Sequence, residues 1–230
     1  MPTPRERLIK SPATMNPSSS APSSPVLQID ALGFAYPDQP AIASNWSARV
    51  GPGVTLLYGD TGAGKTALLQ VIAGALPARG GLTVAGASLA AAPEAYRRNV
   101  FFVDPSTDRF DQGTVHACTA ALREGDAGFE EARWQALVEG FSLTPHLEKS
   151  MFMLSTGSKR KVWLAAALAS SRPLVLLDEP TAALDAGSVR CLWRSLGELA
   201  GPATGRAFVV ASAEHIDAVP LAATISLPLR

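Results

Sequence analysis

The stretch that decides the fold reads Gly59-Asp60-Thr61-Gly62-Ala63-Gly64-Lys65-Thr66. It follows the apolar run Val54–Tyr58, which is typical of a buried strand, and precedes the run Ala67–Ala73, which is typical of a helix. Glycines let successive backbone N–H groups turn inward around an anion, and the N-terminus of the helix adds positive potential. A strand, a glycine-rich loop and a helix in this order predict a phosphate-binding loop.

Two side chains at the end of this loop have a specific chemistry. Lys65 can bring a positive charge to the β- and γ-phosphates of a nucleotide, and the hydroxyl of Thr66 can bind Mg²⁺. The alternative is a glycine-rich turn that matches the pattern by chance. A second motif further along the chain decides between the two.

This second motif is an apolar run, Leu174–Leu177, that ends in Asp178 and Glu179. We expect Asp178 to hold Mg²⁺ and Glu179 to be the catalytic residue, which polarises a water for attack on the γ-phosphate. An apolar strand that ends in acids is common on its own. Together with the phosphate-binding loop, it identifies a P-loop nucleotidase.

The residues around the acidic pair narrow the class further. Before it stands Leu154-Ser155-Thr156-Gly157-Ser158-Lys159-Arg160, and after it stands Pro180-Thr181-Ala182-Ala183-Leu184-Asp185. In the order and spacing of these motifs, the chain after residue 25 resembles the ATP-binding cassette (ABC) ATPases. Their signature is usually Leu-Ser-Gly-Gly-Gln, so the version in this chain is atypical.

The resemblance implies that ATP and Mg²⁺ are the cofactors and that Tyr36 stacks on the adenine. An ordinary edge-strand tyrosine is the alternative for Tyr36. The implied nucleotide-binding set is Tyr36, Gly59, Asp60, Thr61, Gly62, Ala63, Gly64, Lys65, Thr66 and Ala67.

The resemblance also implies that a complete site needs two chains. The signature would reach the γ-phosphate held by the opposite protomer, and Asp185 would cross the interface between the protomers. The implied signature contacts are Ser155, Thr156, Gly157 and Ser158. We therefore expect ATP-dependent pairing with a second ATPase protomer, identical or not.

Two positions depart from the family pattern near the expected γ-phosphate. Asp104 stands where a glutamine is usual, and it is either a Mg²⁺ ligand or part of an Asp-Pro turn without a metal contact. The switch histidine is usually one step past Ser212, where this chain has Ala213. His215 either serves as a displaced switch histidine or lies on the surface.

The signature departs from the pattern as well. Thr156 replaces a glycine, and Ser158-Lys159 replaces Gly-Gln. Lys159 either assists anion binding or is a solvated helix residue. Because none of these changes removes Lys65 or Glu179, we expect hydrolysis to survive and to be slow without a partner.

The expected fold class is α/β: a P-loop NTPase core with a mixed β-sheet flanked by helices. Residues 25–230 form the ATPase domain, with an antiparallel β portion near its N-terminus and a small helical lobe inserted at about residues 114–172. Helical spacing of Phe129, Ala132, Ala136 and Phe141 supports this lobe. Residues 1–24 are rich in Pro and Ser, and we expect a disordered tail there.

The composition limits the partners. The formal net charge is +0, which does not favour nucleic-acid binding. The longest nearly apolar run, Val162–Ala169, is much shorter than the roughly 20 residues of a membrane-spanning helix. The resemblance implies an integral membrane permease as a partner, which we therefore expect to be a separate chain, with this protein on the cytoplasmic face of the membrane. Cys118 and Cys191 lie far apart in the sequence and are expected to be packed, reduced thiols.

The leading function is an ATP-hydrolysing subunit that energises an ABC transporter. Two other functions stay open. One is a nucleotide-binding regulatory cassette with very slow hydrolysis, which the residues Asp104 and Ala213 favour. The other is a soluble ABC ATPase that remodels a complex and has no part in transport.

Overall fold

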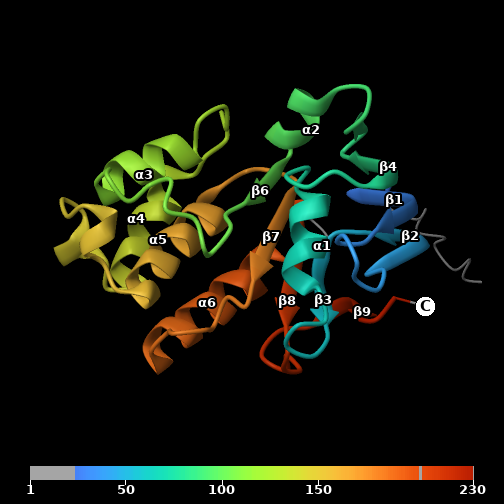
Figure 1. Ribbon diagram of the computed structural model, residues 1–230. Helices are drawn as coiled ribbons and strands as arrows, with labels where there is room; N and C mark the ends of the chain where they lie inside the picture. Colours follow the sequence, from blue (N-terminus) through green and yellow to red (C-terminus); the bar gives the residue numbers. More distant parts are fainter. Residues whose placement is uncertain (1–23, 202–203, 230) are drawn as a thin grey trace, which may run out of the picture.

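The computed structural model describes residues 24–201 and 204–229 (Figure 1). The tail expected at residues 1–24 therefore lies outside the described residues except for Ser24. The described chain forms two sheets with helices around them and a helical lobe at one side.

A five-stranded parallel sheet occupies the centre, with the strand order β6-β7-β8-β3-β9. Its strands are β6 (Val100–Phe102), β7 (Leu174–Asp178), β8 (Ala207–Ser212), β3 (Gly53–Tyr58) and β9 (Leu221–Ser226). Tyr58 pairs with Ser212, and Asp178 pairs with Ala211. The carboxyl ends of β3, β7 and β8 consequently meet at one edge of the sheet, where α/β proteins bind their ligands.

A four-stranded antiparallel sheet lies beside it, with the order β2-β1-β4-β5. Its strands are β1 (Leu27–Phe34), β2 (Ala43–Val50), β4 (Arg79–Val84) and β5 (Ala87–Ser88). The predicted fold class is thus confirmed. The parallel and antiparallel strands that we expected in a mixed sheet lie in two separate sheets.

Helices cover the sheets and form the lobe. Helices α1 (Lys65–Ile72), α2 (Pro93–Arg98) and α6 (Ala186–Leu199) belong to the core. Between β6 and β7 the chain forms α3 (Val115–Leu122), α4 (Glu131–Gly140), α5 (Thr156–Ala169) and two short 3₁₀ turns, η1 (Thr144–His146) and η2 (Met151–Met153). In Figure 1 this lobe lies to the left of α1.

The central strands are mostly apolar and almost wholly buried, as expected where both faces of the sheet are covered. Val175 and Leu177 of β7 belong to the hydrophobic cluster formed with the lobe and α6, whereas Leu174 and Leu176 belong to the cluster formed with α1 and the antiparallel sheet. Both cysteines are free and buried, as expected. Within residues 24–201 and 204–229, no helix is long and apolar enough to span a bilayer.

Candidate functional site

The phosphate-binding loop connects β3 to α1 as the sequence predicts. Gly62 and Gly64 have φ angles of 83° and 95°, in the left-handed region that favours glycine. Gly64 directly precedes α1, and a Cβ atom there would lie 2.6 Å from the Ile42 side chain. The loop thus needs glycine at this position for two reasons, its backbone angle and the close approach of Ile42.

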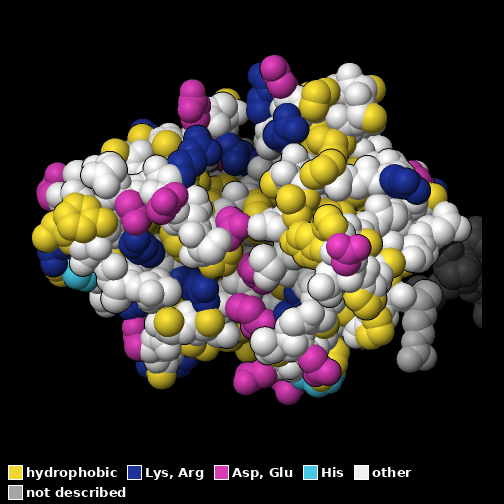
Figure 2. All heavy atoms as spheres, in the orientation of Figure 1, with side chains coloured by type: hydrophobic (Ala, Val, Ile, Leu, Met, Phe, Trp, Pro, Cys, Tyr) yellow, Lys and Arg dark blue, Asp and Glu magenta, His cyan; other side chains and the backbone are white. Residues whose placement is uncertain are grey.

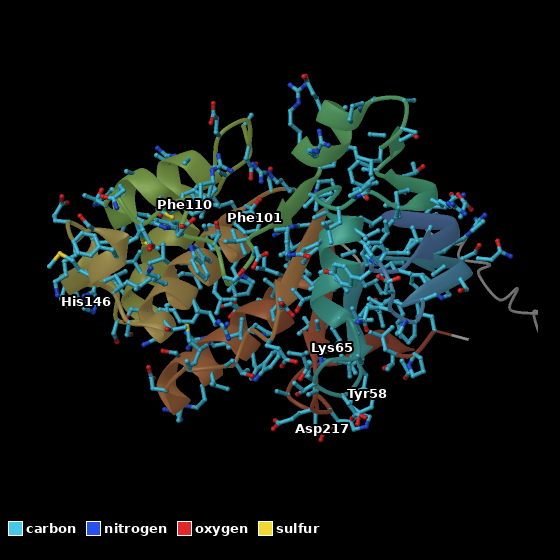
Figure 3. All side chains as sticks on the ribbon, in the orientation of Figure 1. Tyr58, Lys65, Phe101, Phe110, His146 and Asp217 are labelled. Carbon is cyan, nitrogen blue, oxygen red and sulfur yellow. The ribbon has the colours of Figure 1, made fainter. Side chains whose placement is uncertain are left out.

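Lys65 is folded back into the loop. Its Nζ donates to the carbonyl oxygens of Gly59 and Asp60 at 2.7 and 3.1 Å, and it forms an ion pair with Glu179 Oε1 at 3.2 Å. Figure 3 shows Lys65 at the start of α1, near Tyr58 at the end of β3. Two backbone carbonyls and one carboxylate therefore hold the ammonium group and balance its charge within the chain.

Thr66 and Asp178 provide oxygen atoms that fit a magnesium ion. The Thr66 hydroxyl donates to Asp178 Oδ2 at 2.7 Å. Asp178 Oδ1 is buried and has no hydrogen-bond partner among the described residues. Burial raises the pKa of Asp178, and the nearby charge of Glu179 raises it further, although Thr66 opposes the shift. A cation would compensate for this buried carboxylate, and Mg²⁺ prefers hard oxygen ligands from one or two side chains.

Glu179 begins the loop after β7 in a strained conformation. Its φ is 42°, which is uncommon for a residue with a side chain. The Glu179 N–H donates to the Ala211 carbonyl at 3.0 Å, and Arg160 donates to the Glu179 carbonyl at 2.7 Å. These bonds hold the backbone, so the carboxylate is aimed from a fixed base toward Lys65. Such local strain is common at functional sites.

Lys65, Thr66 and Glu179 line one open cleft of about 570 Å³ at the edge of the parallel sheet. Tyr36, Ala182 and Ala213 also line the cleft. Its volume is within the usual range for a small-molecule site. The Tyr36 ring is 43% exposed and packs edge-on against Phe34, with the ring centroids 5.2 Å apart. One face of this tyrosine is consequently available for a flat partner. In Figure 2, charged side chains of both signs meet between the helical lobe and α1.

The signature segment caps helix α5 outside this cleft. Ser155 is the N-cap, and its hydroxyl oxygen accepts from the Ser158 N–H at 3.2 Å. A Cβ atom at Gly157 would overlap the carbonyl oxygen of Ala183, which has a φ of 61°. Thr156 is exposed at the first turn. Gly157 is therefore required within the chain itself, because the loop after the acidic pair packs directly on it.

The basic residues after the signature bind the chain's own acceptors. Lys159 forms an ion pair with Asp111, and Lys161 Nζ contacts Asp185 Oδ2 at 2.6 Å. Asp185 is also the N-cap of α6, with Oδ1 accepting from the Ser188 N–H. Hydrogen bonds from Lys161 and Ser188 lower the pKa of Asp185 far below its ordinary value. The charge of Lys159 is thus held internally by Asp111.

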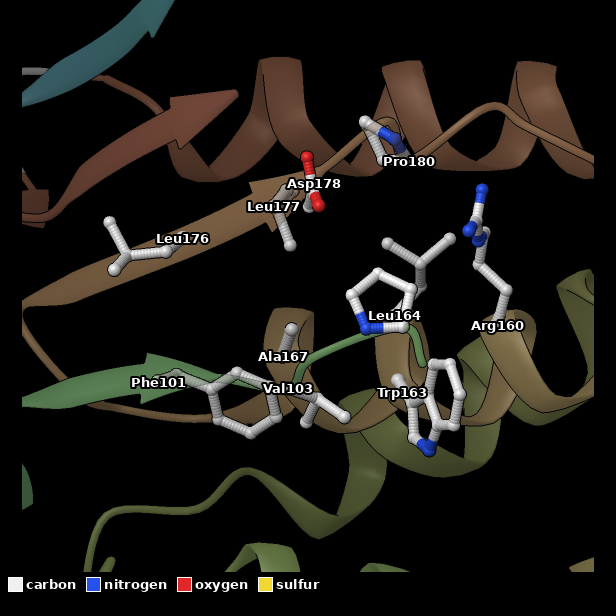
Figure 4. Close-up of a pocket in the computed structure, with 11 residues that line it drawn as sticks. Phe101, Val103, Arg160, Trp163, Leu164, Ala167, Leu176, Leu177, Asp178 and Pro180 are labelled. Atoms are coloured by element: carbon white, nitrogen blue, oxygen red, sulfur yellow. The ribbon is translucent and has the colours of Figure 1, made fainter. Parts of the chain in front are cut away.

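Arg160 lies at a small cavity of about 30 Å³ between α5 and the parallel sheet (Figure 4). It donates to the carbonyl oxygens of Glu179 and Ala182 at 2.7 and 2.9 Å, so it connects α5 to the acidic loop, residues 179–185 between β7 and α6. Figure 4 shows Asp178 on β7 across the cavity from α5. This arginine was not among the predicted site residues, because its two acceptors are backbone atoms that become neighbours only in the fold.

Asp104 forms the Asp-Pro turn that was one of its two interpretations. Its Oδ1 accepts from the backbone N–H and the hydroxyl of Ser106, at 2.8 and 2.7 Å. Its Oδ2 accepts from Gln70 Nε2 at 2.6 Å. Burial raises the pKa of Asp104, but these hydrogen bonds outweigh the burial and the pKa is lowered overall. Both oxygens have donors already, and direct binding of Mg²⁺ by Asp104 stays a prediction.

His215 is exposed and stacks on Tyr58, with the ring centroids 4.3 Å apart and the planes at 21°. Ala213, two residues earlier, is the position that lines the cleft. This arrangement agrees with the surface interpretation of His215, and its role as a switch histidine stays a prediction.

The comparisons with known proteins agree with this geometry. The ABC transporter family model matches residues 44–182, which include the phosphate-binding loop, the signature and the acidic pair. The chain belongs to the ABC transporter family. The prediction that it is the ATP-binding domain of such a transporter is confirmed. Membership of this ABC family also implies ATP hydrolysis.

Several relatives are ATP-binding proteins of ABC transporters. The cytochrome c biogenesis ATP-binding export protein CcmA of Rhodospirillum rubrum is 38% identical over 66% of this chain and 66% of its own length. A putative ABC transporter ATP-binding protein of Gloeobacter violaceus is 33% identical over 75% of each chain. A solved structure, an ATP binding subunit of an ABC transporter, superposes with a TM-score of 0.69 at 25% identity, covering 81% of this chain and 79% of its own. The alignment thus spans about two thirds of the length of the first relative.

Proposed function

We propose that this ABC protein binds Mg-ATP and hydrolyses it in a head-to-tail pair with a second ATPase protomer. This cycle energises transport through an integral membrane permease that is a separate chain. The observation that carries the proposal is the meeting of Lys65, Thr66, Asp178 and Glu179 at one edge of the parallel sheet. These four side chains provide the charge, the cation ligands and the base that phosphoryl transfer to water requires.

Each of these residues has a distinct task. Lys65 leaves its ion pair with Glu179 and binds the β- and γ-phosphates, which offer it stronger negative charge than one carboxylate. Thr66 and Asp178 would hold the cation through their side-chain oxygens. A bound Mg²⁺ would neutralise the charge that develops on the phosphate oxygens. Once free of Lys65, a Glu179 carboxylate oxygen orients a water and accepts its proton.

The second protomer is needed because the signature segment does not line the cleft of its own chain. Its exposed positions at the start of α5, Ser155 and Thr156, are free to face the γ-phosphate bound by another copy or by a non-identical cassette. Such head-to-tail contacts close when each protomer completes the other's site. The protein would work at the cytoplasmic face of the membrane through its permease, and no direct nucleic-acid contact is expected.

The test is the substitution Glu179→Gln, which keeps the shape and removes the base. Hydrolysis should fall about 10²- to 10⁴-fold, whereas Mg-ATP still binds. Size-exclusion chromatography with Mg-ATP should show a trapped dimer for the variant and a monomer after nucleotide removal. A variant that stays monomeric and hydrolyses ATP at the wild-type rate would remove Glu179 from catalysis.

A second candidate function is a regulatory cassette that binds ATP with very slow turnover. The observation that favours it is Ala213, a small apolar residue that lines the cleft without offering a polar group to the γ-phosphate. Steady-state phosphate release, measured with the permease present, separates the two functions. A rate well below one turnover per minute alongside tight ATP binding would support regulation.

A further inference from the structure

Gln70 on α1 lies at the cleft, next to the expected cation position. It follows Thr66 by one helical turn, so the two side chains emerge on the same face of α1. Gln70 lines the cleft together with Lys65, Thr66 and Glu179. None of the sequence motifs assigns a role to this glutamine.

A hydrogen bond from Gln70 to Asp104 fixes how the Gln70 amide is turned. The Gln70 Nε2 atom lies 2.6 Å from Asp104 Oδ2. Because a carboxylate only accepts, the amide must present its NH₂ group to Asp104. The carbonyl oxygen, Oε1, is then the atom left over, and it has no hydrogen-bond partner within the described part of the chain. An oriented acceptor is therefore available at the cleft.

Asp104 is itself held in place. The Ser106 backbone N–H and hydroxyl both donate to Oδ1, and the Asp-Pro turn holds the residue beside α1. The Gln70 side chain thus has an anchored partner, and less rotamer freedom remains to be lost when a ligand binds. An anchored partner of this kind pre-organises a binding group.

We propose that Gln70 binds the hydrated Mg²⁺ of Mg-ATP through Oε1 and that Asp104 is the residue that positions it. The inference rests on the proposed function and adds a residue to the same site. Mg²⁺ keeps several waters when it binds a nucleotide, and an amide oxygen can accept from one of them. Asp104 then acts through Gln70 and needs no direct contact with the metal.

The first experiment compares Gln70→Met with a matched control, Gln135→Met. Methionine keeps the length and helix propensity and removes both amide groups. Gln135 is an exposed residue of α4, away from the cleft. The measurement is the dissociation constant of a non-hydrolysable fluorescent ATP analogue, with Mg²⁺ and with EDTA. Gln70→Met should weaken binding about fivefold to tenfold in Mg²⁺ and leave it unchanged in EDTA.

A second readout is independent of nucleotide fluorescence. Binding of Mn²⁺ to the complex of protein and analogue, followed by electron paramagnetic resonance, should weaken by a similar factor in Gln70→Met. The Gln135→Met control should match the wild type in both measurements. An equal loss with and without the metal, or no loss, would overturn the inference.

The positioning role of Asp104 is tested with a double-substitution cycle. Asp104→Ala alone should reproduce most of the metal-dependent loss, and adding it to Gln70→Met should cause little further change. Additive losses would instead show that Asp104 binds the metal by itself, which would overturn its positioning role. If the wild-type chain bound the analogue equally well with and without Mg²⁺, that result would contradict the proposed function itself, whatever the role of Gln70.

Discussion

Two regions of this cassette differ in how they are built: the phosphate-binding half around Lys65, and the signature half at the start of α5. The phosphate-binding half is open: Lys65, Thr66 and Glu179 line a cleft of about 570 Å³, and Lys65 forms an ion pair with Glu179. The signature half is closed by its own chain, because Gly157 packs on Ala183 and Arg160 bonds the loop after β7. One half therefore offers groups that can move onto a ligand, and the other offers a rigid edge.

Contacts between the two halves couple them within one chain. The N-terminal turn of α5 contacts the acidic loop through Gly157, through Arg160 and through the ion pair of Lys161 with Asp185. Because Arg160 donates to the Glu179 carbonyl, a displacement of the signature edge would act directly on the backbone of Glu179, the proposed catalytic residue. The signature edge and the acidic loop should consequently move as one unit when a second protomer approaches.

The substitution expected to have the largest effect removes the centre of the open half. Lys65→Ala deletes the charge that we propose binds the phosphates, together with the donor to two loop carbonyls. Each charge-assisted contact contributes about 1.5–3 kcal/mol, so ATP affinity should fall at least about tenfold to a hundredfold. Hydrolysis should become undetectable. Isothermal titration with Mg-ATP and a phosphate-release assay measure both effects.

Lys149→Ala is the matched control for Lys65→Ala. Lys149 is an exposed lysine of the helical lobe and does not line the cleft. Its removal should leave both measurements near the wild type. Unchanged affinity in Lys65→Ala would mean that the open half does not bind phosphate there, and the comparison between the two halves would lose its basis.

The next substitution breaks the closed half. In Gly157→Ala the added methyl group meets the Ala183 carbonyl, so the loop must shift away from α5. Overpacking of this kind costs about 1–3 kcal/mol of stability. Hydrolysis should fall at least about tenfold, whereas ATP binding to the monomer should stay within about twofold, because Gly157 does not line the cleft.

Gly51→Ala serves as the control, since a Cβ atom there meets nothing within 4 Å. Urea unfolding and phosphate release, measured for both variants, separate lost stability from lost coupling. If Gly157→Ala weakened ATP binding to the monomer as strongly as it slowed hydrolysis, the two halves would not be separable in the way that the contacts suggest.

The sequence predicted the central strands because their apolar runs are continuous. It did not predict β9, whose residues Leu221–Ser226 are mostly exposed at the sheet edge and carry no buried pattern. In α4 the alanines at 132 and 136 that supported the helix are exposed, while Trp134 and Val138 are buried. Alanine is small enough for either face, so it indicates a helix without showing which side is covered.

The candidate site likewise has parts that the sequence predicts and parts that it does not. The phosphate-binding loop and the acidic pair are local motifs, and the residues of each stand next to one another in the sequence. The contact of Gln70 with Asp104 joins residues 34 positions apart, and that of Arg160 with Ala182 joins residues 22 apart. Such pairs exist only after the strands have set the loops side by side. Patterns in the sequence cannot predict them.

The smallest effect is expected at His215, which lies at the border of the open half. Its ring stacks on Tyr58 and is exposed, and Ala213 occupies the position that faces the cleft. His215→Ala should therefore change hydrolysis less than about twofold, and exposed substitutions of this kind usually change stability by no more than about 0.5 kcal/mol. Phosphate release measured with the partner present is the decisive assay. A large loss of hydrolysis would mean that His215 leaves Tyr58 and reaches the γ-phosphate in the closed pair. His215 would then be a further mobile group of the open half.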